Sequence, residues 1–439
     1  TGFGWADVAT TVSGRWWVGG GTGNWSSTTN WATSDGGGSG ASVPIGEIVY
    51  FTATSGAITA TVNAASSCGD LTCTGFTGAI VATDTLTVSG SLTLSSGMIY
   101  KSTGELINLS GSGTSKTINL AGKVVGRLDF TGVDHFSNNL FYSNGFGDTW
   151  TLASDVICNV TNSSSLTSGT FNAANYNLTI WSFSSNNSNA KSLLMGSGTW
   201  TLFGTDTVWI ITARDPYTLT PSTSTIKITD SSSTNKTFSG GGLTYNNLWF
   251  TGYGTGTNTI AGANTFNDLK VDNPPKSIIF PAGVINKFNT FTIAGTAGNL
   301  MTIRGNTAGT KSYIQQLVGS ISGDYFLIYD TSVIGVAYAG THSINAEAAG
   351  LSGNNTNWFF TAPAQQISGV VTLAGTPVSG ALVKLILSAD NTEVGYTTTN
   401  GSGVYSFYAD PAKLYHVAVE YTTGGVKYSD FSKWAITPV

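Results

Sequence analysis

The sequence predicts an all-β protein whose main body is a parallel β-helix, or β-solenoid. Three observations lead to this prediction. Charged residues make up only 9% of the 439 residues, compared with about 25% in an average soluble protein. Glycine occupies 56 positions, which is typical of a chain with many turns. Short segments that alternate Thr or Ser with an aliphatic residue recur along the chain, and no segment sustains helical periodicity.

The composition also excludes several classes of partner. A net charge of -5 provides no basic surface to neutralise phosphates, so we expect no nucleic-acid partner. The apolar run 277–284 is far shorter than the roughly 20 residues of a membrane-spanning helix, so we expect no membrane insertion. Cys68, Cys73 and Cys158 lack the spacing of a zinc site. We expect them to be buried thiols, with a Cys68–Cys73 bridge as the alternative, and we expect no cofactor.

The first segment, residues 1–44, is rich in tryptophan and glycine, and we expect it to form an N-terminal entry or cap. It contains the run RWWVGGGTGNWSSTTNW at 15–31. The glycine strings at 19–25 and 36–42 do not end in the GK[ST] that a phosphate loop requires. No nucleotide site is therefore expected in this segment.

Residues 45–361 are expected to form the β-solenoid. At 85–94 the sequence TLTVSGSLTL alternates Thr or Ser with aliphatic residues. Because successive side chains of a strand point to opposite faces, this alternation predicts strands with a polar outer face and an apolar inner face.

A short related unit recurs in this tract as GDLTCTG, GRLDFTG, NNLWFTG and NDLKVDN. Its central leucines, Leu71, Leu128, Leu248 and Leu269, are separated by 57, 120 and 21 residues. These separations are close to three, six and one times roughly 20, a period typical of stacked repeats. We therefore expect rungs of about 20 residues and about 16 coils. The rival interpretation is a string of β-sandwiches, for which the Pro274–Pro275 pair is the candidate interior break.

Residues 362–439 begin with a stretch at 362–366 that looks like a hinge, and the residues after it resemble the carboxypeptidase-regulatory-like, transthyretin-like β-sandwich family. The matching residues are Gly369-Val-Val, Gly375–Ala381, Thr397–Asn400, Gly403–Phe407 and Tyr415. The resemblance implies an Ig-like β-sandwich in which Gly380-Ala381 turns into a core strand and Gly403 closes a hairpin. It also implies a non-catalytic spacer or adhesion module.

The entry segment is similar to a Trp-Gly motif of repetitive β-helical surface proteins of bacteria and of phage structural proteins. The whole layout of entry motif, solenoid and terminal module resembles a tailed-phage virion protein. This resemblance implies a location on the virion surface, with an extracellular or cell-surface location as the alternative. It implies other virion proteins as partners and a homo-oligomer, for which a trimer is expected.

The sequence offers few candidates for catalysis. His135, His342 and His416 lie in different contexts without a metal-ligand spacing, so we expect structural roles for them. Glycosidase chemistry needs two carboxyl groups about 5–9.5 Å apart. Four pairs of charged residues are candidates for this chemistry, but we expect them to be turn residues instead. They are Asp129 with Asp134, Asp268 with Asp272, Asp324 with Asp330, and Arg214 with Asp215.

Tryptophans of the solenoid tract are the better functional candidates. Trp181, Trp200, Trp209 and Trp249 lie there, and the first two are 19 residues apart, about one rung. If they are exposed on one face, they form a platform on which sugar rings stack. The alternative is an aromatic stack inside the solenoid, because tryptophan buries a large apolar area.

Together these observations predict a non-enzymatic structural protein of a phage virion, a tail fibre, spike or capsid decoration, that adheres to host or environmental glycans. One alternative is an exported bacterial surface adhesin or filament subunit. A second alternative is a glycan-degrading tail-spike enzyme.

Overall fold

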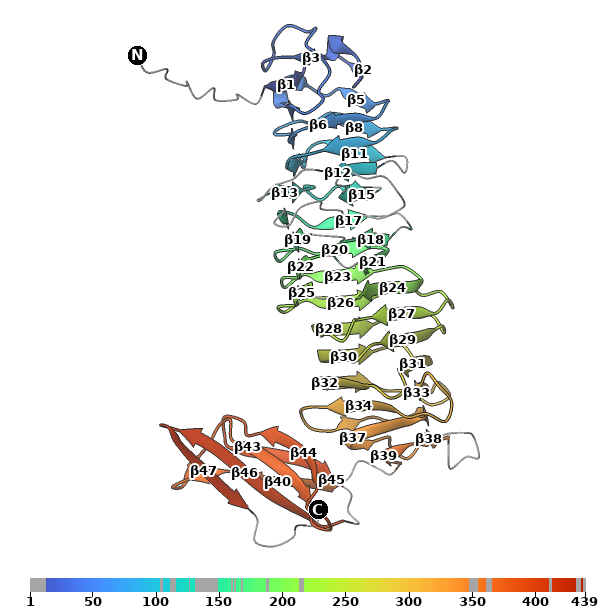
Figure 1. Cartoon of the computed structure of the whole chain (residues 1–439), viewed down its shortest axis with the longest axis vertical. Helices are drawn as coiled ribbons and strands as arrows, with labels where there is room; N and C mark the ends of the chain where they lie inside the picture. Colours follow the sequence, from blue (N-terminus) through green and yellow to red (C-terminus); the bar gives the residue numbers. More distant parts are fainter. Residues whose placement is uncertain are drawn as a thin grey trace. The chain divides into compact units, whose positions relative to one another are not determined.

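The computed structural model is nearly all β, and the described residues contain two short 3-10 helices, η1 (Thr28–Asn30) and η2 (Ala53–Ser55) (Figure 1). The chain divides into two compact units. The first is Thr1–Phe203 with Arg214–Ser224, and the second is Gly204–Ala213 with Thr225–Val439. The structure describes residues 13–102, 106–110, 116–125, 127–130, 149–158, 161, 163–166, 169–186, 189–212, 217–346, 354–360, 365–409, 413–431 and 436.

In the first unit, strands of successive rungs pair in parallel and build stacked sheets (Figure 1). The first sheet contains β1 (Gly14–Trp17), β3 (Trp31–Ala32), β4 (Ile48–Tyr50), β7 (Leu71–Thr72), β10 (Leu92–Thr93), β13 (Lys116–Asn119), β16 (Thr149–Leu152), β19 (Gly169–Asn172), β22 (Lys191–Leu194) and β25 (Tyr217–Thr220). The next two sheets contain β2 (Thr22–Asn24), β5 (Thr59–Val62), β8 (Ala79–Ala82) and β11 (Ile99–Ser102), and β6 (Ser66–Cys68), β9 (Leu86–Val88), β12 (Leu106–Leu109) and β15 (Arg127–Phe130). Later rungs add β14 (Val124–Val125), β17 (Val156–Cys158), β20 (Leu178–Ile180) and β23 (Thr199–Leu202), and β18 (Ser163–Ser165) beside β21 (Ser182–Ser185).

In the second unit, two parallel sheets continue the same kind of stacking, and antiparallel sheets follow. One parallel sheet contains β26 (Thr225–Ile228), β28 (Thr244–Phe250), β30 (Thr265–Val271), β32 (Ile285–Ile293), β34 (Ser312–Gln316), β37 (Thr331–Tyr338), β35 (Ile321–Ser322) and β39 (Thr356–Phe359). The other contains β24 (Asp206–Ile211), β27 (Lys236–Ser239), β29 (Thr257–Ala261), β31 (Lys276–Phe280), β33 (Met301–Gly305), β36 (Phe326–Tyr329) and β38 (Ile344–Asn345).

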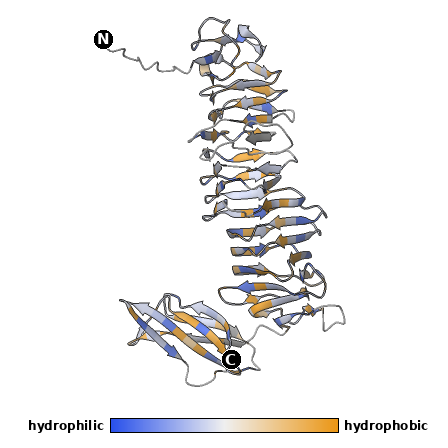
Figure 2. Ribbon diagram, viewed as in Figure 1, coloured by the Kyte–Doolittle hydropathy of each residue, from blue (hydrophilic) through white to orange (hydrophobic). Residues whose placement is uncertain are grey.

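These parallel ladders confirm the predicted β-solenoid. Alternation within each strand separates its two faces: in β26, Ile226 and Ile228 are buried, whereas Thr225 and Lys227 are partly exposed. Figure 2 shows hydrophobic and hydrophilic residues interspersed along the strands in this way. The inner side chains form the apolar core, and the burial of each large aliphatic side chain stabilises the fold by about 1.5–3 kcal/mol.

The repeat spacing predicted from the sequence is partly wrong. Leu248 does pair with Leu269, but Leu71 pairs with Leu92, and Leu128 lies in β15, which belongs to a different sheet from β7. The separations of 57 and 120 residues therefore do not count rungs.

The described part of the solenoid has about 12 turns, fewer than the 16 expected. Its rungs are longer than 20 residues, because turns lengthen between strands: Ile279 pairs with Arg304, and Lys116 pairs with Trp150. The Pro274–Pro275 pair lies in the turn between β30 and β31 and does not separate two sandwiches.

Side chains in the turns join neighbouring rungs. Asp70 Oδ1 accepts a hydrogen bond from the backbone N–H of Ser91 at 2.7 Å, and Asn177 Oδ1 accepts one from Thr199 at 2.9 Å. Each bond spans 21 or 22 residues, which is one rung. Short Asn and Asp side chains suit these turns because they satisfy backbone groups that the strand ladders leave unpaired.

At the N-terminal end, β3 pairs antiparallel with β1, whereas β4 pairs parallel with the other side of β1. An aromatic cluster at this end contains four side chains, each at most 1% exposed and in contact with other rings of the set: Trp17, Trp25, Trp31 and Phe51. The Trp31 Nε1 donates to the Trp25 carbonyl at 2.8 Å. The antiparallel strand thus covers an edge that would otherwise be free to pair with another chain.

The C-terminal strands pair antiparallel and form a β-sandwich. Their sheets contain β40 (Gln365–Val370) with β45 (Val404–Ala409), β41 (Thr372–Leu373) with β42 (Thr376–Pro377), and β44 (Glu393–Thr398), β43 (Leu382–Leu387), β46 (Tyr415–Thr423) and β47 (Val426–Phe431) in that order. Buried residues from both layers, among them Ile367, Val383 and Phe407, form its core.

The turn expected at Gly380 is confirmed, whereas the hairpin expected at Gly403 is not formed: β45 pairs with β40 and β44 pairs with β43, so the chain passes from one sheet to the other at Gly403. Gly380, at φ +75°, precedes β43, and the adjacent Ala381 is fully buried. Gly403, at φ +72°, turns the chain into β45, and a Cβ added there would lie 2.6 Å from the Val371 carbonyl oxygen. Glycine is required at position 403 both by this close approach and by the left-handed backbone.

Candidate functional site

Trp200 is a core residue and not part of an exposed platform. Its side chain is 0% exposed. It pairs with Leu178 of the neighbouring rung and meets Phe171 and Phe183 edge to face, at centroid distances of 6.0 and 5.6 Å. Trp181 therefore does not share its column, although the two tryptophans are one rung apart in sequence.

Trp209 is likewise 0% exposed. Its ring stacks on Phe238 at 5.9 Å and 12°, and its Nε1 donates to Tyr245 Oη at 3.2 Å. The platform interpretation is thus wrong for Trp200 and Trp209, and the alternative of interior packing is correct. The physical reason is strand alternation, which turns both indoles inward, where their large apolar area contributes to the core.

Trp181 follows the end of β20 and is partly exposed. Its ring meets Phe203 edge to face at 5.5 Å and 84°. Because Trp200 is buried, the two tryptophans do not form a shared platform, and a stacking role for Trp181 by itself stays a prediction.

Trp249 lies at the centre of a polar surface of the second unit, which we call the Trp249 face: Lys227 of β26, Trp249 of β28, Lys270 of β30 and Asp272 of the turn after β30. Lys227 and Lys270 pair with Trp249 from the rungs on either side. Their Nζ atoms lie 4.6 and 4.2 Å from the ring centroid. Such cation–π contacts contribute about 0.5–1 kcal/mol each at exposed sites.

Asp272 fixes the orientation of this face. Its Oδ2 accepts a hydrogen bond from Trp249 Nε1 at 2.6 Å and lies 3.3 Å from Lys270 Nζ. Trp249 is partly exposed, unlike Trp200 and Trp209, and its ring already contacts two ammonium groups and the Asp272 carboxylate. The stacking role of Trp249 stays a prediction.

Beside the Trp249 face, amide side chains of successive rungs form an asparagine ladder: Asn247, Asn267 and Asn289. Asn289 Nδ2 donates to Asn267 Oδ1 at 2.9 Å, and Asn267 Nδ2 donates to Asn247 Oδ1 at 3.3 Å. Asn247 Nδ2 then donates to Thr225 Oγ1 at 3.3 Å. The ladder links uncharged donors and acceptors of successive rungs on the outside of the sheet, although the strand register pairs Asn247 with Asp268 and not with Asn267.

The carboxylates weighed as catalytic pairs are engaged in structural contacts. Asp268 accepts a hydrogen bond from Thr290. Asp330 is 4% exposed, and its Oδ2 accepts from the Gly309 N–H at 3.1 Å. Asp134, Arg214 and Asp215 lie outside the described residues, as does the side chain of Asp129. The turn interpretation is favoured for the described carboxylates.

Asp324 and His342 form the closest pair of acid and base among the described candidates. Asp324 Oδ2 lies 2.7 Å from His342 Nδ1, its Oδ1 accepts from the His342 backbone N–H at 3.0 Å, and the imidazole stacks on Tyr325 at 4.7 Å. Burial opposes the shift, but the hydrogen bonds from His342 and from backbone N–H groups lower the pKa of Asp324 below its ordinary value. The pair joins two turns of adjacent rungs. His416 lies within β46, and His135 lies outside the described residues.

The cysteines are buried and free, as expected. Burial raises the pKa of the Cys68 and Cys73 thiols, which disfavours the reactive thiolate. Four of the described lysines are buried, among them Lys191, which is 4% exposed, and Lys276, which is 5% exposed. Burial lowers the pKa of Lys191 and that of Lys276 to about 8.

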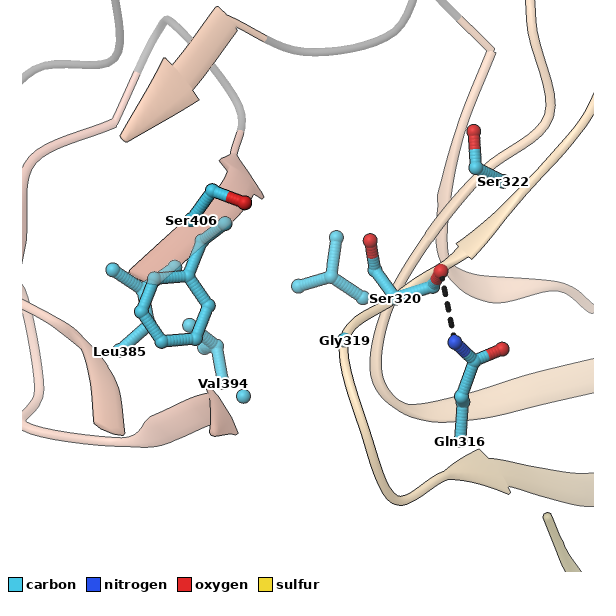
Figure 3. Close-up of a pocket in the computed structure, with 10 residues that line it drawn as sticks. Gln316, Gly319, Ser320, Ser322, Leu385, Val394 and Ser406 are labelled. Carbon is cyan, nitrogen blue, oxygen red and sulfur yellow. Dashed lines mark hydrogen bonds between the residues drawn. The ribbon is translucent and has the colours of Figure 1, made fainter. Parts of the chain in front are cut away.

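A cleft of about 240 Å³ in the second unit is lined by ten residues, none of them ionisable. Figure 3 shows Gln316, Ser320, Val394 and Ser406 among them, with Gln316 turned toward the Ser320 backbone. Gln316 Nε2 donates to the carbonyls of Val318 at 2.8 Å and Ser320 at 3.2 Å. The lining offers no group for acid–base catalysis.

Within the described residues, no three His, Cys, Asp or Glu side chains gather as metal ligands, and no helix there has the length and hydrophobicity to span a membrane. No family model, curated protein or solved structure matches the chain. The fold and its outer surface define a β-solenoid protein with a C-terminal β-sandwich and an outward polar face centred on Trp249.

Sequence reasoning missed the two lysines that flank Trp249. Lys227, Trp249 and Lys270 follow one another at separations of 22 and 21 residues, close to the length of one rung. That spacing is a usable signal once the register of the sheet is known.

Proposed function

We propose that this chain is a non-enzymatic structural protein of a phage virion, a tail fibre, spike or capsid decoration, that adheres to glycans of host or environmental surfaces. One observation carries the adhesive part of the proposal: the Trp249 face and the asparagine ladder lie side by side on one sheet. Their amides, hydroxyls and ammonium groups are the donors and acceptors that sugar hydroxyls require.

A non-enzymatic role is supported by the condition of the carboxylates. Hydrolysis of a glycosidic bond needs two carboxyl groups on either side of the bond, one of them with a raised pKa. Asp324 has the opposite shift, and Asp268 and Asp330 are hydrogen-bonded to groups of their own or neighbouring rungs.

A structural role is supported by the fold. β-Solenoids are common in phage tail fibres and adhesins. Their ladders of backbone hydrogen bonds leave few unpaired backbone segments that a protease could cleave. Homotrimerisation and contacts with other virion proteins belong to the same proposal. Sedimentation equilibrium of the purified chain tests the trimer.

Immunogold electron microscopy tests the location. Antibodies raised against the purified chain are applied to phage particles and to the bacterial cells that produce them. Gold on particles supports the proposal. Gold confined to the surface of uninfected cells favours the bacterial adhesin or filament subunit and contradicts a virion protein.

A further inference from the structure

We infer that the Trp249 face binds acidic polysaccharides through Lys227, with the indole serving to hold the ammonium groups in place. The inference rests on the proposed function and names the ligand chemistry of its site. It differs from a stacking platform, because the ligand contacts the ammonium group of Lys227, and the indole holds the lysine side chains instead of a sugar ring.

The first step of the argument is charge. Lys270 forms an ion pair with Asp272, which also accepts the hydrogen bond of the Trp249 indole N–H. The positive charge of Lys270 is therefore largely compensated. Lys227 has no ion-pair partner among the described residues, although its Nζ is held 4.6 Å from the ring centroid of Trp249. A fixed and uncompensated ammonium group in a chain of net charge -5 selects an anionic group.

The second step is preorganisation. Lysine normally loses rotamer freedom when it binds a ligand, but here the indole already restricts the side chain. Lys227 and Lys270 lie one rung to either side of Trp249, and both ammonium groups are held against the same ring. A ligand that reaches Trp249 therefore meets an ammonium group whose position is already restricted.

The third step is the polar surround. The column next to the lysines consists of Thr225, Asn247 and Asp268, which pair with one another across β26, β28 and β30. Thr225 and Asn247 place a hydroxyl and an amide beside Lys227, and the Asp268 carboxylate is hydrogen-bonded to Thr290. A hydroxyl and an amide beside an ammonium group fit a ligand that carries both carboxylates and hydroxyls. A uronic-acid polysaccharide has this chemistry, whereas a neutral glucan has the hydroxyls alone.

The test is isothermal titration calorimetry, in which the full chain is titrated with polygalacturonate and, separately, with dextran as the neutral polymer. Lys227→Met keeps the aliphatic stem and removes the charge. Lys101→Met is the matched control, since Lys101 is an exposed strand residue of β11 in the first unit. We expect polygalacturonate to bind with an affinity that falls on addition of salt, that decreases roughly tenfold or more in Lys227→Met, and that is unchanged in Lys101→Met.

Trp249→Leu provides a second readout, because it leaves both lysines in place and removes only the ring that positions them. It is expected to weaken binding of polygalacturonate while the thermal melting curve shows a folded protein. Equal affinities of Lys227→Met and Lys101→Met would overturn the inference. Binding of dextran but not of polygalacturonate would overturn it and leave glycan adhesion standing, whereas binding of neither polymer nor of isolated host surface glycan would overturn both.

Discussion

Asn264→Ala is expected to destabilise locally the turn between β29 and β30, where hydrogen bonds of the Asn264 side chain hold neighbouring turns together. The Asn264 side chain is 0% exposed. Its Oδ1 accepts from the Gly242 N–H at 3.0 Å, and its Nδ2 donates to the carbonyls of Ala261 at 2.9 Å and Gly262 at 3.2 Å. A fourth and longer contact joins Nδ2 to Asn286 Oδ1 at 3.5 Å. Loss of the three shorter hydrogen bonds at about 1 kcal/mol each predicts a local destabilisation of about 3 kcal/mol.

Hydrogen exchange measured by NMR is the suitable assay, because a stacked repeat can open locally and exchange reports the opening at a single amide. The Gly242 amide loses its partner in Asn264→Ala, and its exchange should accelerate on the order of a hundredfold. Asn267→Ala is the control. Asn267 lies only three residues away and is exposed, so water replaces its ladder bonds and the expected change is within about 0.5 kcal/mol. Equal effects of the two substitutions would refute this assignment of inward and outward residues.

Three further outcomes are expected. Trp200→Ala should destabilise the first unit by about 3–5 kcal/mol in urea denaturation, and the partly exposed Trp181→Ala should cost clearly less; equal costs would contradict the burial of Trp200. Gly403→Ala should lower the stability of the sandwich by at least about 1–2 kcal/mol because of its left-handed backbone, seen as faster amide exchange in β45, and unchanged exchange would count against the turn. Because the folded pKa of Lys191 is about 8, below its unfolded value of about 10.4, the unfolded state binds more protons between those values and stability rises with pH there. Urea titrations from pH 7.5 to 10 should show this rise in the wild type and lose part of it in Lys191→Met; identical slopes would exclude the effect.

The alternation of polar and apolar residues was sufficient to predict strands with an inner and an outer face, because alternation and turn residues are local properties of the chain. The stacking of these strands into a solenoid was inferred from the repeat spacing as well. Rung length was less predictable. A turn adds residues without changing the pattern of the strands that it connects, so the leucines at 71, 128 and 248 looked like equivalent positions although they lie in different sheets.

The direction of individual side chains was also beyond the sequence. The alternation of inward and outward side chains is interrupted within some strands. In β28, Asn246 and Asn247 are consecutive and both partly exposed, whereas Tyr245 and Leu248 on either side are buried. After such an interruption, every later residue of the strand points to the opposite face from the one that strict alternation predicts. The same uncertainty left Trp200 and Trp209 as candidates for an exposed platform, and it concealed the lysines on either side of Trp249.

Adhesion without cleavage is the central claim, and one experiment measures both parts of it. The purified chain is incubated with host capsule, and bound protein and released reducing ends are measured together. Asp268→Asn and Asp324→Asn serve as controls for any activity. We predict that the wild-type chain stays bound to the capsule and releases no oligosaccharide. Release of oligosaccharide that either substitution abolishes would contradict the account and establish a glycan-degrading enzyme.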